Sequence, residues 1–118
     1  MKVIICGAGQ VGAQIASHLS LEKNDITVID NNSDRITQLI NTLDISGVVG
    51  CASHPDILES AGARDCDMVI ATTKSDEINM IICQVSHSVF SIPRKIARIR
   101  SQSYLETNYS DLYRAEHL

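Results

Sequence analysis

The chain has 118 residues, of which 44% are hydrophobic, and its formal net charge is −4 at neutral pH. This length suits a single domain with an ordinary buried core, the acidic balance argues against general nucleic-acid binding, and no apolar run approaches the roughly 18 residues that span a bilayer. The chain begins directly with a strand-like segment, so we expect no signal peptide, no insertion into a membrane and a cytoplasmic location.

The first segment carries the strongest motif of the chain. An apolar run leads directly into a G-x-G-x-x-G pattern at residues 7–12, and apolar residues at helical spacing follow over about 10–21. In this strand–turn–helix context the pattern is typical of a dinucleotide-binding turn. Gly7 would allow the tight turn, Gly9 the close approach of a pyrophosphate, and Gly12 the close packing of helix on strand. The free N–H groups of the new helix would face the phosphates.

The second predicted strand, 26–29, ends at an acidic residue, Asp30. Asp30 follows the glycine motif at about the distance, roughly 20 residues, at which dinucleotide-binding folds place a carboxylate for the ribose hydroxyls. The alternative interpretation is a structural turn with a surface aspartate. The segment 31–34 is rich in helix-capping residues, and apolar residues as far as Leu43 indicate the next helix.

A short third strand is predicted over 46–50, where a glycine closes it. Ser53 is then the expected N-cap of a third helix, with Pro55 tolerated in the first turn and Asp56 placed to complete a cap-like pair. Gly62 suits the left-handed position that ends this helix.

The remaining elements continue the alternation of strands and helices. A fourth strand is predicted over 67–71 and a long helix over 75–88. Pro93 stops any helix and precedes a fifth strand over 95–100, and a last helix is predicted over 104–118. The apolar residues predicted to share one side of the long helix are Ile78, Ile81, Ile82 and Val85.

This alternation predicts the fold. Strands that alternate with helices pair in parallel through right-handed crossovers. We therefore expect an α/β, Rossmann-type doubly wound parallel sheet in three αβα layers, with about five to six strands. A full doubly wound unit has six strands, and five are visible. Residues 1–118 are thus expected to form one nucleotide-binding domain that is a fragment of a longer protein.

Ligands of such sheets bind beyond the carboxyl ends of the strands, where the strand order reverses. Gly50, after the third strand, would let the backbone approach an adenine or ribose. Thr72 and Thr73, after the fourth, carry hydroxyls that could bond a phosphate or ribose. The predicted nucleotide-binding residues are Gly7, Ala8, Gly9, Gln10, Val11, Gly12, Asp30, Asn31, Arg35, Gly50, Cys51, Ala52, Thr72, Thr73 and Arg98.

Charged residues near the last strand ends leave alternatives open. Arg98 and Arg100 share one face if the fifth strand reaches them. Arg98 would grip a phosphate with its planar guanidinium or form a salt bridge with an acid. For Arg100 a salt bridge with a nearby acid is favoured. Asp76 and Glu77, at the start of the long helix, either face the ligand or only stabilise the helix dipole.

No pattern in the chain indicates catalysis or metal binding. The four cysteines are scattered, without a C-x-x-C pair, and the four histidines are equally dispersed. Cys6 and Cys83 fall in apolar segments and are interpreted as small core residues. The sequence offers no histidine–acid pair and no nucleophile elbow. We predict no metal site, no catalytic residues and no enzymatic activity.

The ordered combination of motifs resembles the N-terminal nucleotide-binding domain of the KTN/RCK family, the regulators of potassium conductance, in particular the subgroup that serves bacterial potassium uptake. The resemblance extends from Met1 to about Leu105, which is most of the chain. The segments that carry it are 1–12, 28–30, 61–67, 71–79 and 96–100.

The resemblance implies regulation. Family members form homodimers that assemble into rings beneath a membrane pore, bind NAD(H), ATP or ADP, and change potassium flux when the ligand is exchanged. It implies a cytoplasmic module that gates a potassium transporter, held at the inner face of the cell membrane through that partner. By the same resemblance the phosphates would meet Gly7, Gly9, Gly12 and Arg98, the ribose Asp30, the adenine edge Gly50 and Cys51, and the middle of the cleft Thr72 and Thr73.

One departure from the family pattern concerns the turn after the third strand. The family usually has Asp or Asn after the glycine, whereas this chain has Cys51. A polar side chain that could bond the adenine or its ribose is lost there. Two other interpretations stay open: the cofactor domain of an NAD-dependent oxidoreductase, and a module that binds no nucleotide and only assembles.

Overall fold

Five parallel strands form the centre of the structure, which is a computed structural model and describes residues 1–105. The strands are β1 (Lys2–Cys6), β2 (Asp25–Asp30), β3 (Ser46–Val49), β4 (Met68–Ala71) and β5 (Arg94–Ala97). Their order in the sheet is β3-β2-β1-β4-β5, and every neighbouring pair is parallel. After β3 the chain therefore crosses β2 and β1 to add β4 on the far side. The doubly wound arrangement predicted from the sequence is confirmed.

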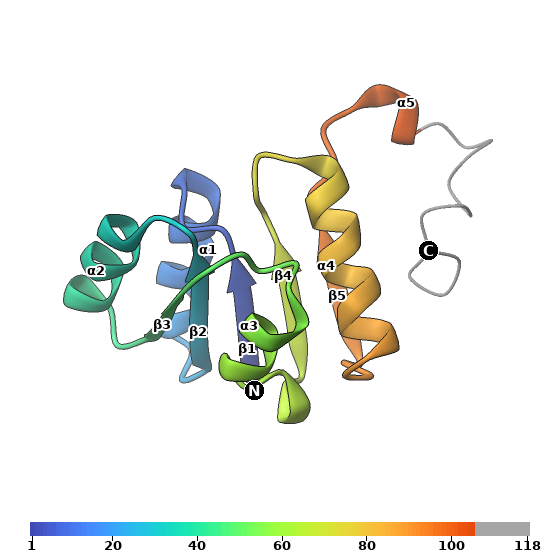
Figure 1. The fold of residues 1–118 in the computed structure, drawn as a ribbon. Helices are drawn as coiled ribbons and strands as arrows, with labels where there is room; N and C mark the ends of the chain where they lie inside the picture. The colour runs from blue at the N-terminus through green and yellow to red at the C-terminus, as the bar shows by residue number, and fades with distance from the viewer. Residues whose placement is uncertain (106–118) are drawn as a thin grey trace.

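Helices cover both faces of the sheet and make three layers (Figure 1). The helices α1 (Gln10–Ser20) and α2 (Ser33–Thr42) pack on one face. The other face carries α3 (Pro55–Ser60), a 3-10 turn η1 (Ala63–Asp65) and α4 (Asp76–Ser88). A short helix, α5 (Gln102–Leu105), follows β5.

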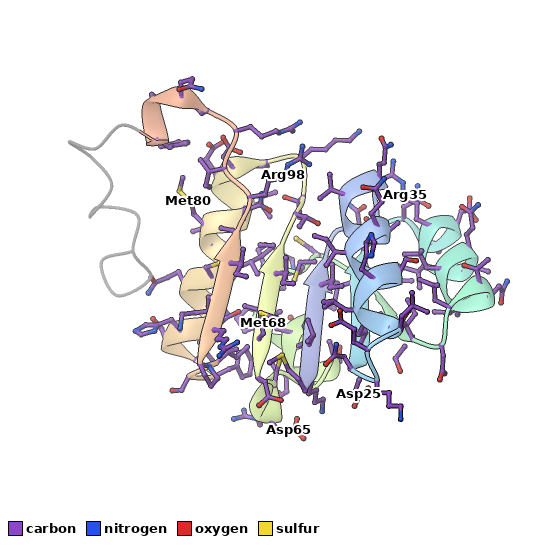
Figure 2. All side chains as sticks on the ribbon, turned by 180° about the vertical axis from the view of Figure 1, so that it is seen from behind. Asp25, Arg35, Asp65, Met68, Met80 and Arg98 are labelled. Carbon is purple, nitrogen blue, oxygen red and sulfur yellow. The ribbon has the colours of Figure 1, made fainter. Side chains whose placement is uncertain are left out.

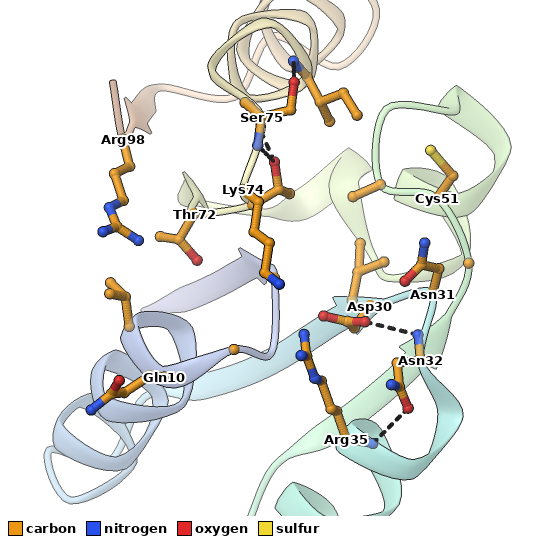
Figure 3. A pocket seen from close by; sticks show the side chains of 18 of the residues that line it. Gln10, Asp30, Asn31, Asn32, Arg35, Cys51, Thr72, Lys74, Ser75 and Arg98 are labelled. Carbon is orange, nitrogen blue, oxygen red and sulfur yellow. Dashed lines mark hydrogen bonds between the residues drawn. The ribbon is translucent and has the colours of Figure 1, made fainter. Parts of the chain in front are cut away.

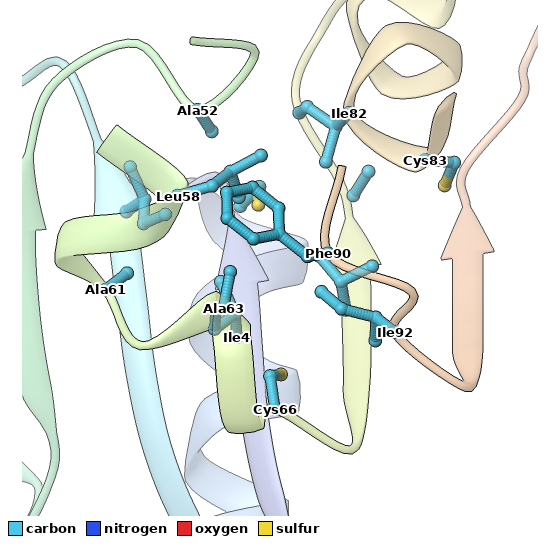
Figure 4. Packing of buried hydrophobic residues seen from close by; sticks show 14 residues of the cluster. Ile4, Ala52, Leu58, Ala61, Ala63, Cys66, Ile82, Cys83, Phe90 and Ile92 are labelled. Atoms are coloured by element: carbon cyan, nitrogen blue, oxygen red, sulfur yellow. The ribbon is translucent and has the colours of Figure 1, made fainter. Parts of the chain in front are cut away.

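The central strand β1 supplies both cores because successive side chains of a strand point to opposite faces. Val3 and Ile5 pack with residues of α1 and α2, whereas Ile4 and Cys6 pack with residues of α3 and α4. All four side chains are completely buried. Figure 4 shows the second of these clusters, in which Leu58, Ile82, Phe90 and Ile92 close over the sheet.

The predicted cap of α2 and the predicted end of α3 are confirmed, and α4 also has a side-chain cap. The side chain of Asn32 accepts hydrogen bonds from the N–H groups of Asp34 and Arg35, and that of Ser75 accepts one from Ile78 N–H. Gly62 has a φ of 94° just after α3, in the left-handed region.

The predicted capping of α3 is wrong. The N-cap is His54, without a side-chain hydrogen bond, and Pro55 is the first helical residue. Ser53 does not cap the helix, because its hydroxyl oxygen instead lies 3.1 Å from the Cys51 sulfur. Asp56 completes no cap-like pair, since no side chain caps this helix.

The predicted buried side of α4 is also wrong in part. Ile82 is fully buried and lies in the core, but Ile78 and Ile81 are 39% and 46% exposed. The inner face of the helix instead includes Asn79 and Ser86, both completely buried. Apolar residues alone do not reveal that Asn79 is buried, because one of its hydrogen-bond partners, Arg98, lies 19 residues away. The predicted buried side is therefore displaced by about one residue along the helix.

The fifth strand is shorter than predicted, since it ends at Ala97 rather than at residue 100. Arg98 still donates its backbone N–H to the Ala71 carbonyl, and the chain then turns away toward α4. Of the last predicted helix, the structure describes α5, while 106–118 lie outside the described residues. Within 1–105, no helix has the length and apolar character needed to cross a membrane.

Two neighbouring isoleucines of α4 test this packing. Ile82→Ala removes a fully buried side chain and should lower the free energy of unfolding by about 3 kcal/mol. Ile81→Ala, on the exposed side, is the matched control and should change it by less than about 0.5 kcal/mol. Urea unfolding of both variants measures the difference. Equal losses would mean that α4 presents another side to the sheet.

Candidate functional site

A cleft of about 670 Å³ opens at the carboxyl edge of the sheet (Figure 3). Its walls come from the segments that follow all five strands, since the lining includes residues from 7–11, 29–35, 50–52 and 72–78, together with Arg98 and Arg100. This volume lies within the roughly 300–1,000 Å³ of small-molecule sites. The cleft lies where the order of the strands reverses, which is the place predicted from the sequence.

The structure brings together nearly all of the predicted site residues. Those that line the cleft are Gly7, Gly9, Gln10, Val11, Asp30, Asn31, Arg35, Gly50, Cys51, Ala52, Thr72, Thr73 and Arg98. Ala8 and Gly12 do not line it: Ala8 bonds Asp30 through its backbone, and Gly12 packs behind the turn.

Sequence reasoning left six lining residues out of the predicted site. They are Ile29, Asn32, Lys74, Ser75, Ile78 and Arg100. The available signal was their position at or after the carboxyl ends of β2, β4 and β5, because the segments that leave this edge line the cleft.

The three glycines of the motif have different steric surroundings. Gly7 has a φ of 111°, and a Cβ there would lie 2.9 Å from the Thr72 carbonyl oxygen. A Cβ at Gly12 would lie only 1.8 Å from the Gly7 carbonyl oxygen. At Gly9, by contrast, the nearest atom is an Arg35 nitrogen at 3.9 Å. Gly7 and Gly12 are therefore required by the fold, whereas Gly9 only keeps part of the cleft open.

Helix α1 begins at this open position without a cap of its own. Its N-cap is Gly9, no side chain bonds the first N–H groups, and its first turn carries no acidic residue. Both α2 and α4 have a side-chain cap and an acidic first turn. The backbone N–H groups and the positive dipole end of α1 are thus left for an anion in the cleft.

The carboxylate of Asp30 joins two of the turns. One oxygen accepts a hydrogen bond from Ala8 N–H at 2.7 Å, and the other accepts one from Asn32 N–H at 2.8 Å. An ionised carboxylate has about four acceptor positions. Asp30 therefore fixes the glycine turn against the end of β2 and still has acceptor capacity toward the cleft.

The two threonines after β4 use their hydroxyl protons inside the protein. The Thr72 hydroxyl donates to the Cys6 carbonyl at 3.2 Å. The Thr73 hydroxyl donates to Asn79 Oδ1 at 2.7 Å. A ligand in the cleft would meet their oxygens as acceptors, because these protons are already engaged.

Positive charge dominates the lining of the cleft. Arg35, Lys74, Arg98 and Arg100 line it, with Asp30 as the acidic residue. The guanidinium of Arg98 has no hydrogen bond or ion pair with any residue of 1–105. Arg100 Nη2 donates to the Lys74 carbonyl at 2.7 Å. The predicted salt bridge between Arg100 and an acid is therefore wrong, since its guanidinium meets a carbonyl.

This charge is concentrated at one edge of an acidic chain. Figure 2 shows Arg35 and Arg98 at the carboxyl edge of the sheet, whereas Asp25 and Asp65 lie at the opposite edge. With a formal net charge of −4 for the whole chain, a local excess of cations indicates an anionic ligand rather than a generally basic surface.

The four thiols fall into two groups. Cys6, Cys66 and Cys83 are buried, and burial raises the pKa of all three, that of Cys83 to about 11. Cys51 is partly exposed and lines the cleft. No three metal-binding side chains gather anywhere in the described range.

Comparison with known proteins supplies a family match. Residues 3–114 match the family model of the TrkA-N domain. The Trk system potassium uptake protein TrkA of Azorhizobium caulinodans is 49% identical over all 118 residues of this chain. That alignment covers 26% of the relative, so the chain spans about a quarter of its length.

Solved structures share the fold at lower identity. The Shewanella denitrificans Kef CTD in its AMP-bound form superposes with a TM-score of 0.76 at 23% identity, over 93% of this chain and 69% of that one. A GsuK channel bound to NAD superposes with a TM-score of 0.76 at 19% identity, over 87% of this chain and 18% of that one. Both likenesses confirm the Rossmann-type architecture.

Alanine substitutions distinguish the two kinds of glycine. Gly12→Ala places a methyl group on the Gly7 carbonyl and should lower the free energy of unfolding by at least about 2 kcal/mol. Gly9→Ala makes only an ordinary contact with Arg35, at 3.9 Å, and should lower it by only about 0.5 kcal/mol. Thermal unfolding of the two variants is the measurement, and a Gly9→Ala loss as large as that of Gly12→Ala would contradict the assignment.

Proposed function

The chain belongs to the TrkA-N domain family, and from this premise we propose that it is a nucleotide-binding regulatory domain of a bacterial-type potassium uptake system. The family match extends over nearly the whole chain. The identity of the relative, a potassium uptake protein of the Trk system, supports potassium transport as the process that is regulated. The alternative, the cofactor domain of an oxidoreductase, is not favoured by this membership.

The proposed ligand is NAD(H), with ATP or ADP as alternatives. The observation that carries this proposal is the uncapped start of α1 at Gly9, which opens on the cleft opposite the Asp30 carboxylate. The N–H groups of α1 would bind the phosphates, and Asp30 would accept hydrogen bonds from the ribose hydroxyls. Arg98, whose guanidinium has no partner within 1–105, would meet a phosphate.

The adenine would lie against the turn after β3. Gly50 and Cys51 line this end of the cleft, and the Cys51 thiol is in contact with Ser53. With a thiol in place of a carboxamide or carboxylate, recognition of the base would rest on backbone groups and shape. This predicts modest discrimination between adenine and other bases and leaves the phosphate contacts with most of the binding energy.

Regulation would follow from ligand exchange rather than from chemistry on the ligand. A ligand shifts a conformational equilibrium only by its difference in affinity for the two states. We propose that this non-enzymatic domain is part of a longer chain, that it acts as a homodimer or larger ring, and that it works at the cytoplasmic face of the membrane through a potassium transporter subunit.

Ligand discrimination tests the ribose contact. The protein should bind NADH and ADP, and ligand at 100 times its dissociation constant should stabilise it by roughly 2.7 kcal/mol. ADP should bind more tightly than 2′-deoxy-ADP, because the latter lacks one hydroxyl for Asp30. Asp30→Asn should reduce this preference for ADP, and the change should be large even if the melting temperature falls only slightly. Calorimetric titration measures both ligands, and an unchanged preference in the variant would refute the ribose assignment.

Thiol labelling reports occupancy of the same cleft. At about pH 8 iodoacetamide should modify Cys51 rapidly and the three buried thiols slowly, because the thiolate is the reactive form and burial disfavours it. Saturating ADP should slow the fast reaction, since the thiol lines the cleft. Cys51→Ser is the control that should remove the fast phase. If ADP binds without protecting Cys51, the adenine end has been placed wrongly.

A further inference from the structure

Two polar side chains on one side of α4 reach across to the segment that leaves β5. Asp76 and Asn79 are three residues apart, and residues at this spacing lie on the same face of a helix. Neither is among the residues that line the cleft. Their hydrogen bonds nevertheless go to the backbone of residues that do line it, or that follow such residues directly.

Asn79 is completely buried, and its amide is fully used. Its Nδ2 donates to the Arg98 carbonyl at 2.7 Å and to the Thr73 carbonyl at 3.2 Å. Its Oδ1 accepts from the Thr73 N–H at 2.9 Å and from the Thr73 hydroxyl at 2.7 Å. One side chain thus joins the loop after β4 to the end of β5.

Asp76, about one helical turn before Asn79, binds the next residues of the same segment. Its two carboxylate oxygens accept from the N–H groups of Arg100, at 2.9 Å, and Ser101, at 2.8 Å. These two hydrogen bonds hold the pKa of the Asp76 carboxyl below its usual value, assisted by the nearby charges of Arg100 and Arg98. The carboxylate form is therefore the one that the folded protein prefers.

The sheet alone fixes the Arg98 backbone by one hydrogen bond and does not reach Arg100. Strand β5 ends at Ala97, and one further ladder-like bond, from Arg98 N–H to the Ala71 carbonyl, is made after it. Beyond that point the backbone of 98–101 is held by Asp76 and Asn79. We call these two side chains the α4 clasp.

We propose that the α4 clasp positions Arg98 as the phosphate-binding side chain of the cleft, so that Asp76 and Asn79 determine how strongly the domain responds to the phosphates of its ligand. Figure 3 shows the Arg98 side chain extending from β5 toward Thr72 and the start of α1. This proposal rests on the proposed function, since it requires a phosphate-bearing ligand in the cleft.

The buried amide of Asn79 indicates a role in positioning the cleft residues rather than in packing alone. Burying an amide in a core costs free energy unless every hydrogen bond is satisfied, and an apolar residue would fill the same space at the α4–sheet interface. The bonds that compensate this cost all go to Thr73 and Arg98, which both line the cleft. The buried amide thus fixes the distance between two walls of the site.

The test compares how much the phosphates contribute to binding in matched variants. The ratio of the adenosine and ADP dissociation constants, measured by calorimetry, isolates this contribution. Asp76→Asn retains an acceptor for one N–H but not for both, and should reduce the ratio about tenfold while the affinity for adenosine is unchanged. Arg98→Ala should reduce the ratio at least as much, and adding Asp76→Asn to Arg98→Ala should reduce it no further.

Glu77→Gln is the matched control. It removes the same charge from the same helical turn, but Glu77 accepts from the Tyr104 hydroxyl, on α5, and does not line the cleft. Its ratio should equal that of the wild type. Asn79→Asp retains the acceptor toward Thr73 and sets a carboxylate against the Arg98 carbonyl, so it should reduce the ratio as well. If Asn79→Asp does not fold, Asp76→Asn decides the question.

Two results would overturn the proposal. If a folded Asp76→Asn variant loses affinity for adenosine and ADP equally, the clasp supports the fold and does not position Arg98. The same conclusion holds if Asp76→Asn lowers the ratio equally with and without Arg98. If the wild-type protein binds neither ADP nor NADH, the proposed function fails first, so the two failures are distinguishable.

Discussion

The whole structure depends on β1, which is hydrogen-bonded on both edges, to β2 on one side and to β4 on the other. The chain leaves β1 toward one face of the sheet, and it leaves β4 toward the other. The segments after these neighbouring strands therefore diverge, and nothing in the sheet can fill the space between them. A buried apolar strand at the centre thus creates both the core and the opening at its end.

The fold was predictable because its signals are local and repeated. The runs of Val and Ile, the cap-rich segment around Asn32 and the left-handed Gly62 each specify structure over a few residues, and all were confirmed. The error on the buried side of α4 came where a distant residue decides. Asn79 is buried because Thr73 and Arg98 satisfy its amide, and no local pattern reveals a partner that lies 19 residues away.

The candidate site was predictable in its location and in most of its members, because topology brings every strand end to one edge. Its detailed chemistry was not. The sequence suggested that the hydroxyls of Thr72 and Thr73 would serve a ligand, yet both protons are engaged by the protein. Likewise β5 ends at Ala97, and the Arg98 backbone is bound both by the Ala71 carbonyl of the sheet and by the Asn79 side chain of α4.

The unequal surroundings of the three glycines bear on how related sequences should be interpreted. Two of them are held by main-chain crowding at Thr72 and at Gly7 itself, whatever the cleft contains. A related domain that no longer binds a ligand would still need glycine at positions 7 and 12 in order to fold. Only position 9 could change without a steric clash in the fold. Of the three glycines, Gly9 is therefore the one whose retention is informative about the ligand, since a large side chain there would occupy part of the cleft.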